Sequence, residues 1–73
     1  MQAIDIQKMI EAGLPDATVE VLGDDGQHFE ARVVSPSFAG KSLIAQHKMV
    51  YVTLGDSFES ALHALALKTS APR

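Results

Sequence analysis

Cysteine is absent from the 73 residues, which excludes disulfide bonds, a thiolate nucleophile, and zinc or iron–sulfur sites built from the chain's own thiolates. Stability must therefore come from packing. The composition allows this, because 47% of the residues are hydrophobic and 21% are charged, as in globular rather than disordered chains. We expect one small domain spanning residues 1–73.

Clustered positive charge is also missing. The net charge is −3 and the Lys and Arg residues are scattered, whereas non-specific nucleic-acid binding needs clustered cations that neutralise phosphates. No apolar run reaches the length of a transmembrane helix, and the opening MQAIDIQKM has neither the basic nor the apolar region of a secretory leader. These absences predict a cytoplasmic protein that does not enter a membrane.

The stretch VVSPSFAGKSLIAQH, residues 33–47, resembles a nucleotide-binding loop because it contains the Gly-Lys-Ser that ends the Walker A motif. The motif fails at its start, where Ser35 replaces the first glycine and Pro36 removes a backbone N–H donor. The interpretation that remains is a tight turn at Gly40 followed by a helix. Because no Ser-His-Asp arrangement and no pair of suitably spaced carboxylates stands out, we expect no enzyme.

Hydrophobic periodicity predicts a first helix over residues 4–15. Asp5 is the expected N-terminal cap, and Gly13 with Pro15 marks the end. The members of its apolar stripe are Ile6, Met9, Ile10 and Leu14.

A second helix is predicted over residues 41–54, ended by Gly55. Its apolar stripe consists of Leu43, Ile44, Val50, Tyr51 and Leu54. His47 falls on this stripe, which indicates a buried, hydrogen-bonded core position for its side chain.

Alternating apolar residues predict an antiparallel hairpin of two strands over residues 17–22 and 27–35. The letters GDDG between them predict a tight turn, with Asp25-Gly26 the most favourable pair. The apolar side chains on one face of the hairpin are Val19, Val21, Phe29, Ala31 and Val33. We expect a helix to cover this face.

Residues 58–69 fit two interpretations. Ala and Leu favour a helix, whereas the alternation of Leu65 and Leu67 with small or polar residues fits a strand. We prefer the strand, because a lone two-stranded hairpin is marginally stable and a third strand completes a sheet. The predicted order is α-β-β-α-β, an α+β fold.

The three histidines are the chain's only good ligands for a soft metal ion. His28 stands at the mouth of the predicted hairpin on the face opposite Phe29, and His63 opens the predicted third strand. Surface or capping roles are equally open for isolated histidines. A complete metal site would need ligands from outside the chain.

Taken together, these segments resemble the BolA family. The resemblance rests on GQHFEARVVSPSFAGKSLIAQHKMVYVTLGD and LHALALKT. Its most specific parts are His28-Phe29, Phe38-x-Gly40, His47-x-x-Val50-Tyr51 and His63-Ala64-Leu65. It implies a fold similar to class II KH domains, with a three-stranded mixed sheet and helices packed on one face.

The resemblance also implies a function. BolA-like proteins form heterocomplexes with monothiol glutaredoxins, in which a 2Fe–2S cluster is held by glutaredoxin cysteine, glutathione and histidine of the BolA-like chain. His63 matches the family's ligand in its His-Ala-Leu segment, and His28 is nearest to a second ligand in the loop between the first two strands. His47 matches a histidine of the second helix and remains a packing residue or secondary ligand. The isolated chain is expected to bind no cluster.

Other functions and assemblies remain open. Some BolA-like proteins are described as DNA-binding regulators of stress response and cell morphology, and Lys41 and Lys48 are the cations that the second helix would offer to DNA or to a partner. Because the whole chain is acidic, we expect weak DNA binding or none. A scaffold for the stress response and a homodimer also remain open.

Overall fold

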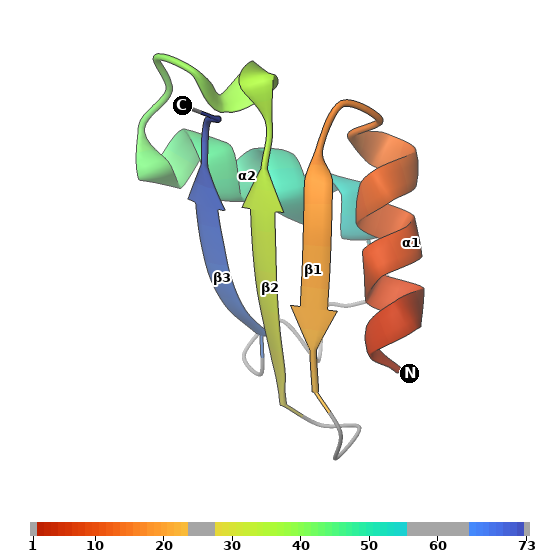
Figure 1. Ribbon diagram of the computed structural model, residues 1–73. Coiled ribbons are helices and arrows are strands. Elements are labelled where there is room, and N and C mark those ends of the chain that lie inside the picture. The colour runs from red at the N-terminus through yellow and green to blue at the C-terminus, as the bar shows by residue number, and fades with distance from the viewer. Residues whose placement is uncertain (1, 24–27, 56–64, 73) are drawn as a thin grey trace.

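The structure is a computed structural model that describes residues 2–23, 28–55 and 65–72. The element order is α1 (Ala3–Gly13), β1 (Thr18–Leu22), β2 (Phe29–Val34), the 3₁₀ helix η1 (Pro36–Phe38), α2 (Leu43–Leu54) and β3 (Leu65–Ser70) (Figure 1). The predicted α-β-β-α-β order is confirmed, with η1 added. The expected turn at Asp25-Gly26 lies outside the described residues.

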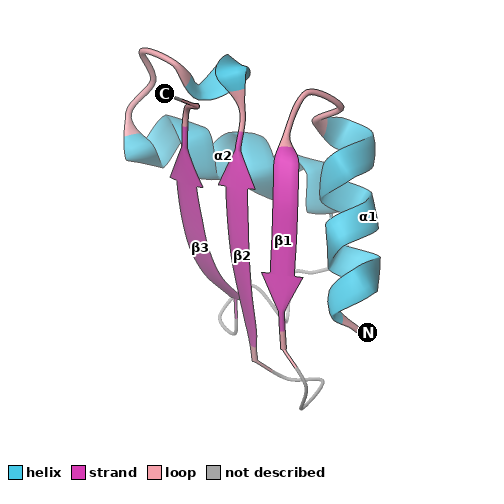
Figure 2. Ribbon diagram, in the orientation of Figure 1, coloured by secondary structure: helices cyan, strands magenta, loops and turns pink. Residues whose placement is uncertain are grey.

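The three strands form one mixed sheet in the order β1-β2-β3 (Figure 2). β1 and β2 are antiparallel, with Val21 opposite Ala31. β2 and β3 are parallel, with Phe29 paired to Leu65 and Val33 to Thr69. A parallel pair needs a crossover, and α2 supplies it by running behind the sheet (Figure 1).

The core lies between the sheet and the two helices, as predicted. The alternating residues of β1 and β2 point into it, and α1 contributes Ile6 and Ile10 while α2 contributes Val50 and Leu54. The opposite face of the sheet, which includes Glu20, Arg32 and Lys68, is exposed. The helices therefore cover one face only, and α1 and β1 pack at one edge.

The stripe predicted for α1 is confirmed, but the cap differs in detail. Ile6, Ile10 and Leu14 are buried and Met9 is half-buried. The N-cap is Gln2 rather than Asp5, and the Asp5 carboxylate accepts a 2.8 Å hydrogen bond from the Gln2 backbone N–H. Asp5 thus satisfies a backbone donor from inside the first turn, as the acidic member of a capping box does.

The stripe predicted for α2 is wrong at its start. Leu43 is 63% exposed and Ile44 is 74% exposed, whereas the buried residues are Gln46, Val50 and Leu54 at intervals of four. The helix begins at Leu43 after the N-cap Ser42, whose hydroxyl accepts a 3.1 Å hydrogen bond from Ala45 N–H. Counting only apolar residues missed Gln46, because its amide is satisfied inside the fold.

Candidate functional site

His28 lies directly before β2, at the mouth of the β1–β2 hairpin, and its side chain is exposed. The hairpin is narrow there. A Cβ placed on Gly23 would lie 2.6 Å from the His28 carbonyl oxygen and 2.7 Å from Phe29 Cδ1. Gly23 therefore lets β1 approach the backbone of His28 more closely than any other residue would.

The β2–β3 register determines which parts of the chain meet at this end of the sheet. Phe29 pairs with Leu65 in the parallel ladder, so the first residues of β2 and β3 are neighbours (Figure 1). His28 precedes the first partner by one position, and His63 precedes the second by two. His63 itself lies outside the described residues, so its side chain has no described position.

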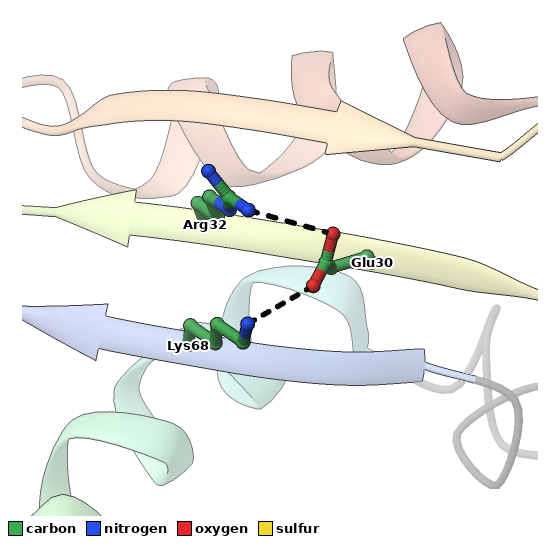
Figure 3. A network of polar contacts seen from close by, with 3 residues as sticks. All are labelled: Glu30, Arg32 and Lys68. Carbon is green, nitrogen blue, oxygen red and sulfur yellow. Dashed lines mark ion pairs between the residues drawn. The ribbon is translucent and has the colours of Figure 1, made fainter.

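Charged side chains continue from this end along the exposed face of the sheet. Glu30 on β2 lies between two cations, with Lys68 Nζ 3.2 Å from Glu30 Oε1 and Arg32 Nη2 3.9 Å from Glu30 Oε2 (Figure 3). Both cations are more than half exposed, so these ion pairs add little stability.

His47 lies on α2 and is half-buried, so its prediction as a buried core histidine is wrong. Its ring packs edge-on against Tyr51, one turn later, with the ring centroids 6.5 Å apart and an interplanar angle of 79°. This contact supports a packing role. Within residues 2–23, 28–55 and 65–72, no group of three or more His, Asp or Glu side chains is arranged to hold a metal ion.

The two predicted contact residues are Lys41 in the loop before α2 and Lys48 within α2. Lys41 lies two residues before the helix, and Lys48 lies within it; both side chains are exposed. The predicted turn is confirmed, since Gly40 adopts a φ of 76°, which favours glycine. Among the helices of the described part, none is long and apolar enough to cross a membrane.

Two polar clusters that sequence reasoning missed fix the segment between β2 and α2. The Asp16 carboxylate accepts hydrogen bonds from the Ser37 hydroxyl at 2.6 Å and the Ser35 hydroxyl at 2.9 Å. The bond from Ser37, and then that from Ser35, holds the pKa of the Asp16 carboxyl below its usual value. Ser35, which replaces the first glycine of the Walker A motif, thus contacts a carboxylate.

The second cluster centres on the buried side chain of Gln46. Its Nε2 donates to the carbonyl oxygens of Lys41 at 2.9 Å and Phe38 at 3.4 Å, and its Oε1 accepts a 2.7 Å hydrogen bond from the Thr69 hydroxyl. One amide thus joins α2, the preceding loop and β3. The Gln46 cluster therefore fixes α2 to the sheet, and the Asp16 cluster fixes the start of the segment that precedes α2.

Comparisons with known proteins agree with this architecture. A solved structure of a bolA protein homologue from Coxiella burnetii is 42% identical with a TM-score of 0.84, covering 99% of this chain and 92% of that one. SufE-like protein 1 of Arabidopsis thaliana is 47% identical over 51 residues, which are 68% of this chain and 14% of that protein.

A third relative is the DNA-binding transcriptional regulator BolA of Escherichia coli, 40% identical over 42 residues, which are 58% of this chain and 40% of that protein. The matched stretches span less than half of either curated relative. The profile of the family described as BolA-like protein matches residues 4–73. The match runs along almost the whole sequence and agrees with the fold, and the chain therefore belongs to the BolA family.

Proposed function

We propose that the chain is a non-enzymatic adaptor that binds a monothiol glutaredoxin and shares its 2Fe–2S cluster, in iron–sulfur trafficking or iron and stress response in the cytoplasm. The observation that carries this proposal is the Phe29–Leu65 register. In this register the first residues of β2 and β3 are neighbours, and these strands follow His28 and His63 in the sequence. The proposal brings the two histidines, which are far apart in sequence, together at this end of the sheet.

The ligands that this chain offers fit a cluster shared with a partner better than a cluster held by this chain alone. A 2Fe–2S cluster takes four ligands, and imidazole can replace thiolate on one iron. The chain has no cysteine, so His63 and His28 would hold one side, while glutaredoxin cysteine and glutathione hold the other. When bound, the cluster supplies a one-electron redox centre and a transferable iron–sulfur unit.

Cluster reconstitution tests this proposal. The full chain is mixed with a monothiol glutaredoxin, glutathione, iron and sulfide, and visible absorption and circular dichroism are recorded. Wild type should give a heterocomplex spectrum distinct from that of glutaredoxin alone. His63→Ala and His28→Ala should change it, whereas the matched control His47→Ala should not. Failure to form a heterocomplex, or wild-type spectra for all three variants, would show the proposal to be wrong.

A second candidate is a DNA-binding regulator. It is favoured by the name of the Escherichia coli relative and by the exposure of Lys41 and Lys48 at α2. Fluorescence anisotropy with duplex DNA at low and physiological salt tests it. Binding that survives physiological salt and falls on Lys48→Ala supports a regulator, whereas two cations alone predict little binding.

A further inference from the structure

The side of α2 that faces away from the sheet carries apolar side chains at high exposure. Ile44 is 74% exposed and Val52 is 79% exposed, and Leu43 at the first turn is 63% exposed. Ile44, Lys48 and Val52 recur at intervals of four, so they form one stripe along the helix. We call Leu43, Ile44, Lys48 and Val52 the outer face of α2.

This exposure is not a consequence of a loosely packed helix. The opposite side of α2 is firmly buried, since Val50 is fully buried and Leu54 is 1% exposed. Gln46 ties the same side to the loop and to Thr69. A helix fixed this well that still presents a row of large aliphatic side chains to water is typical of an interaction surface.

α2 itself carries no acidic side chain, although the chain as a whole is acidic. None of the nine Asp and Glu residues lies in α2 or in residues 35–42 before it, where Lys41 and Lys48 are found. Lys48 is exposed and occupies the middle of the stripe, between Ile44 and Val52. A partner that covers the stripe must therefore place a group near this ammonium, and a carboxylate is the complementary choice.

We propose that the outer face of α2 docks an acidic amphipathic helix of a different protein. Ile44 and Val52 lie about 12 Å apart along the helix axis at 1.5 Å per residue. A partner helix can contact both with aliphatic side chains two turns apart and place Asp or Glu between them, opposite Lys48. Such helix docking uses an apolar stripe for affinity and flanking charge for orientation.

Lys48 also argues against a second copy of this chain on the same face. An antiparallel pair of α2 helices about a two-fold axis would bring Ile44 near the partner's Val52, and would place Lys48 against the Lys48 of the other copy. Like charges at the centre of an interface oppose association. DNA is disfavoured for another reason, because aliphatic side chains flank a single lysine where phosphates would need several cations.

The outer face of α2 and His28 belong to different parts of the fold. α2 crosses behind the sheet and is connected to the C-terminal end of β2 through η1, whereas His28 precedes the N-terminal end of β2 (Figure 1). This inference goes beyond the proposed function and does not depend on it, because the isolated chain should bind the helix without a cluster.

The test uses the ¹⁵N-labelled full chain and a synthetic helical peptide of about 18 residues, roughly five turns, with Leu along one face and Glu beside it. Wild type should bind the peptide with a dissociation constant below about 1 mM, and the amide shifts should change most at residues 43–52. Val52→Ser and Lys48→Glu should each weaken binding about five-fold or more. Both positions are exposed, so the fold should persist.

Charge exchange and matched controls complete the test. A peptide with Lys in place of Glu should bind Lys48→Glu better than wild type, and Lys8→Glu on the exposed side of α1 should bind the acidic peptide like wild type. The proposal is overturned if the acidic peptide does not bind, if Lys48→Glu binds it unchanged, or if the shifts fall on Glu30, Arg32 and Lys68. Tighter binding of duplex DNA or anionic vesicles at α2, or wild-type dimers formed through α2, would also overturn it.

Discussion

Gly13 at the end of α1 lies so close to Thr53 near the end of α2 that a Cβ at position 13 would clash with it. A Cβ at position 13 would lie 2.4 Å from Thr53 Cγ2 and 2.7 Å from Thr53 Cβ. Thr53 cannot easily turn away, because it is β-branched and its hydroxyl donates a 2.6 Å hydrogen bond to the Val50 carbonyl oxygen. The absence of a side chain at Gly13 therefore allows a close approach of α1 and α2 at this point.

Gly13→Ala should therefore lower the free energy of unfolding by about 1–3 kcal/mol, the usual cost of overpacking. Helix propensity alone would predict a gain in stability, because Ala is a better helix former than Gly. Urea denaturation measures the loss. In a Thr53→Ser background, which removes Cγ2, the penalty should shrink, and an equal penalty in both backgrounds would contradict the contact.

Asp16 should make stability depend on pH. Because hydrogen bonds from Ser37 and Ser35 lower its pKa in the folded state, its contribution is fully present above the usual Asp pKa. The contribution is lost as the pH falls through the lowered pKa, since the protonated carboxyl accepts these bonds less well. Asp16→Asn should remove this part of the acid-side loss.

Urea midpoints measured at a series of acidic pH values check the role of Asp16. Glu11→Gln is a matched control, because Glu11 is an exposed carboxylate on α1. Wild type and Glu11→Gln should lose stability in parallel as the pH falls, and Asp16→Asn should start lower and lose less. A parallel loss in all three proteins would mean that the hydrogen bonds from Ser35 and Ser37 do not couple the protonation of Asp16 to folding.

Gln46 should be the most sensitive polar residue of α2. Gln46→Leu leaves the Thr69 hydroxyl and two loop carbonyls without their amide partner. The expected loss is about 1–3 kcal/mol, as for buried polar groups left unsatisfied. Combining it with Thr69→Val in a double-mutant cycle should give less than the sum of the single losses. Strict additivity would show that the two side chains do not act together.

Gly23→Ala tests whether the narrow hairpin mouth supports His28. The added Cβ would press on the His28 carbonyl oxygen and the Phe29 ring, which should displace the backbone of His28. We expect reduced cluster formation with glutaredoxin in addition to lost stability. Gly13→Ala is the matched control, because it overpacks the fold at the α1–α2 contact instead. Equal cluster formation by both variants would show that Gly23 has no specific role in the cluster site.

The parts of the fold that follow from local periodicity were predictable. Val19, Val21 and Phe29 alternate with polar residues, and this pattern identifies the hairpin and its buried face. The exposure of the N-terminal end of α2 was not predictable, because Leu43 and Ile44 count as core residues in any apolar pattern. Only the three-dimensional structure shows that Gln46 takes the buried position, since one of its partners, Thr69, is 23 residues away.

Some residues of the candidate site were likewise predictable from the sequence, and others were not. His28 was placed correctly at the exposed hairpin mouth from strand alternation alone. The burial of His47 was overpredicted, because the apolar stripe of α2 was centred too far toward Ile44. Asp16 gave no local signal, since its serine partners lie 19 and 21 residues further along the chain. The role of His63 stays a prediction.

The most direct measurement asks whether a nitrogen of this chain binds iron. The chain is labelled with ¹⁵N-histidine and mixed with unlabelled glutaredoxin and glutathione, and the cluster is reduced by one electron for pulsed electron paramagnetic resonance. We predict strongly coupled ¹⁵N from His63 and His28, each removed by its own alanine substitution and unaffected by His47→Ala. A reduced heterocomplex cluster without strongly coupled ¹⁵N would contradict the adaptor mechanism.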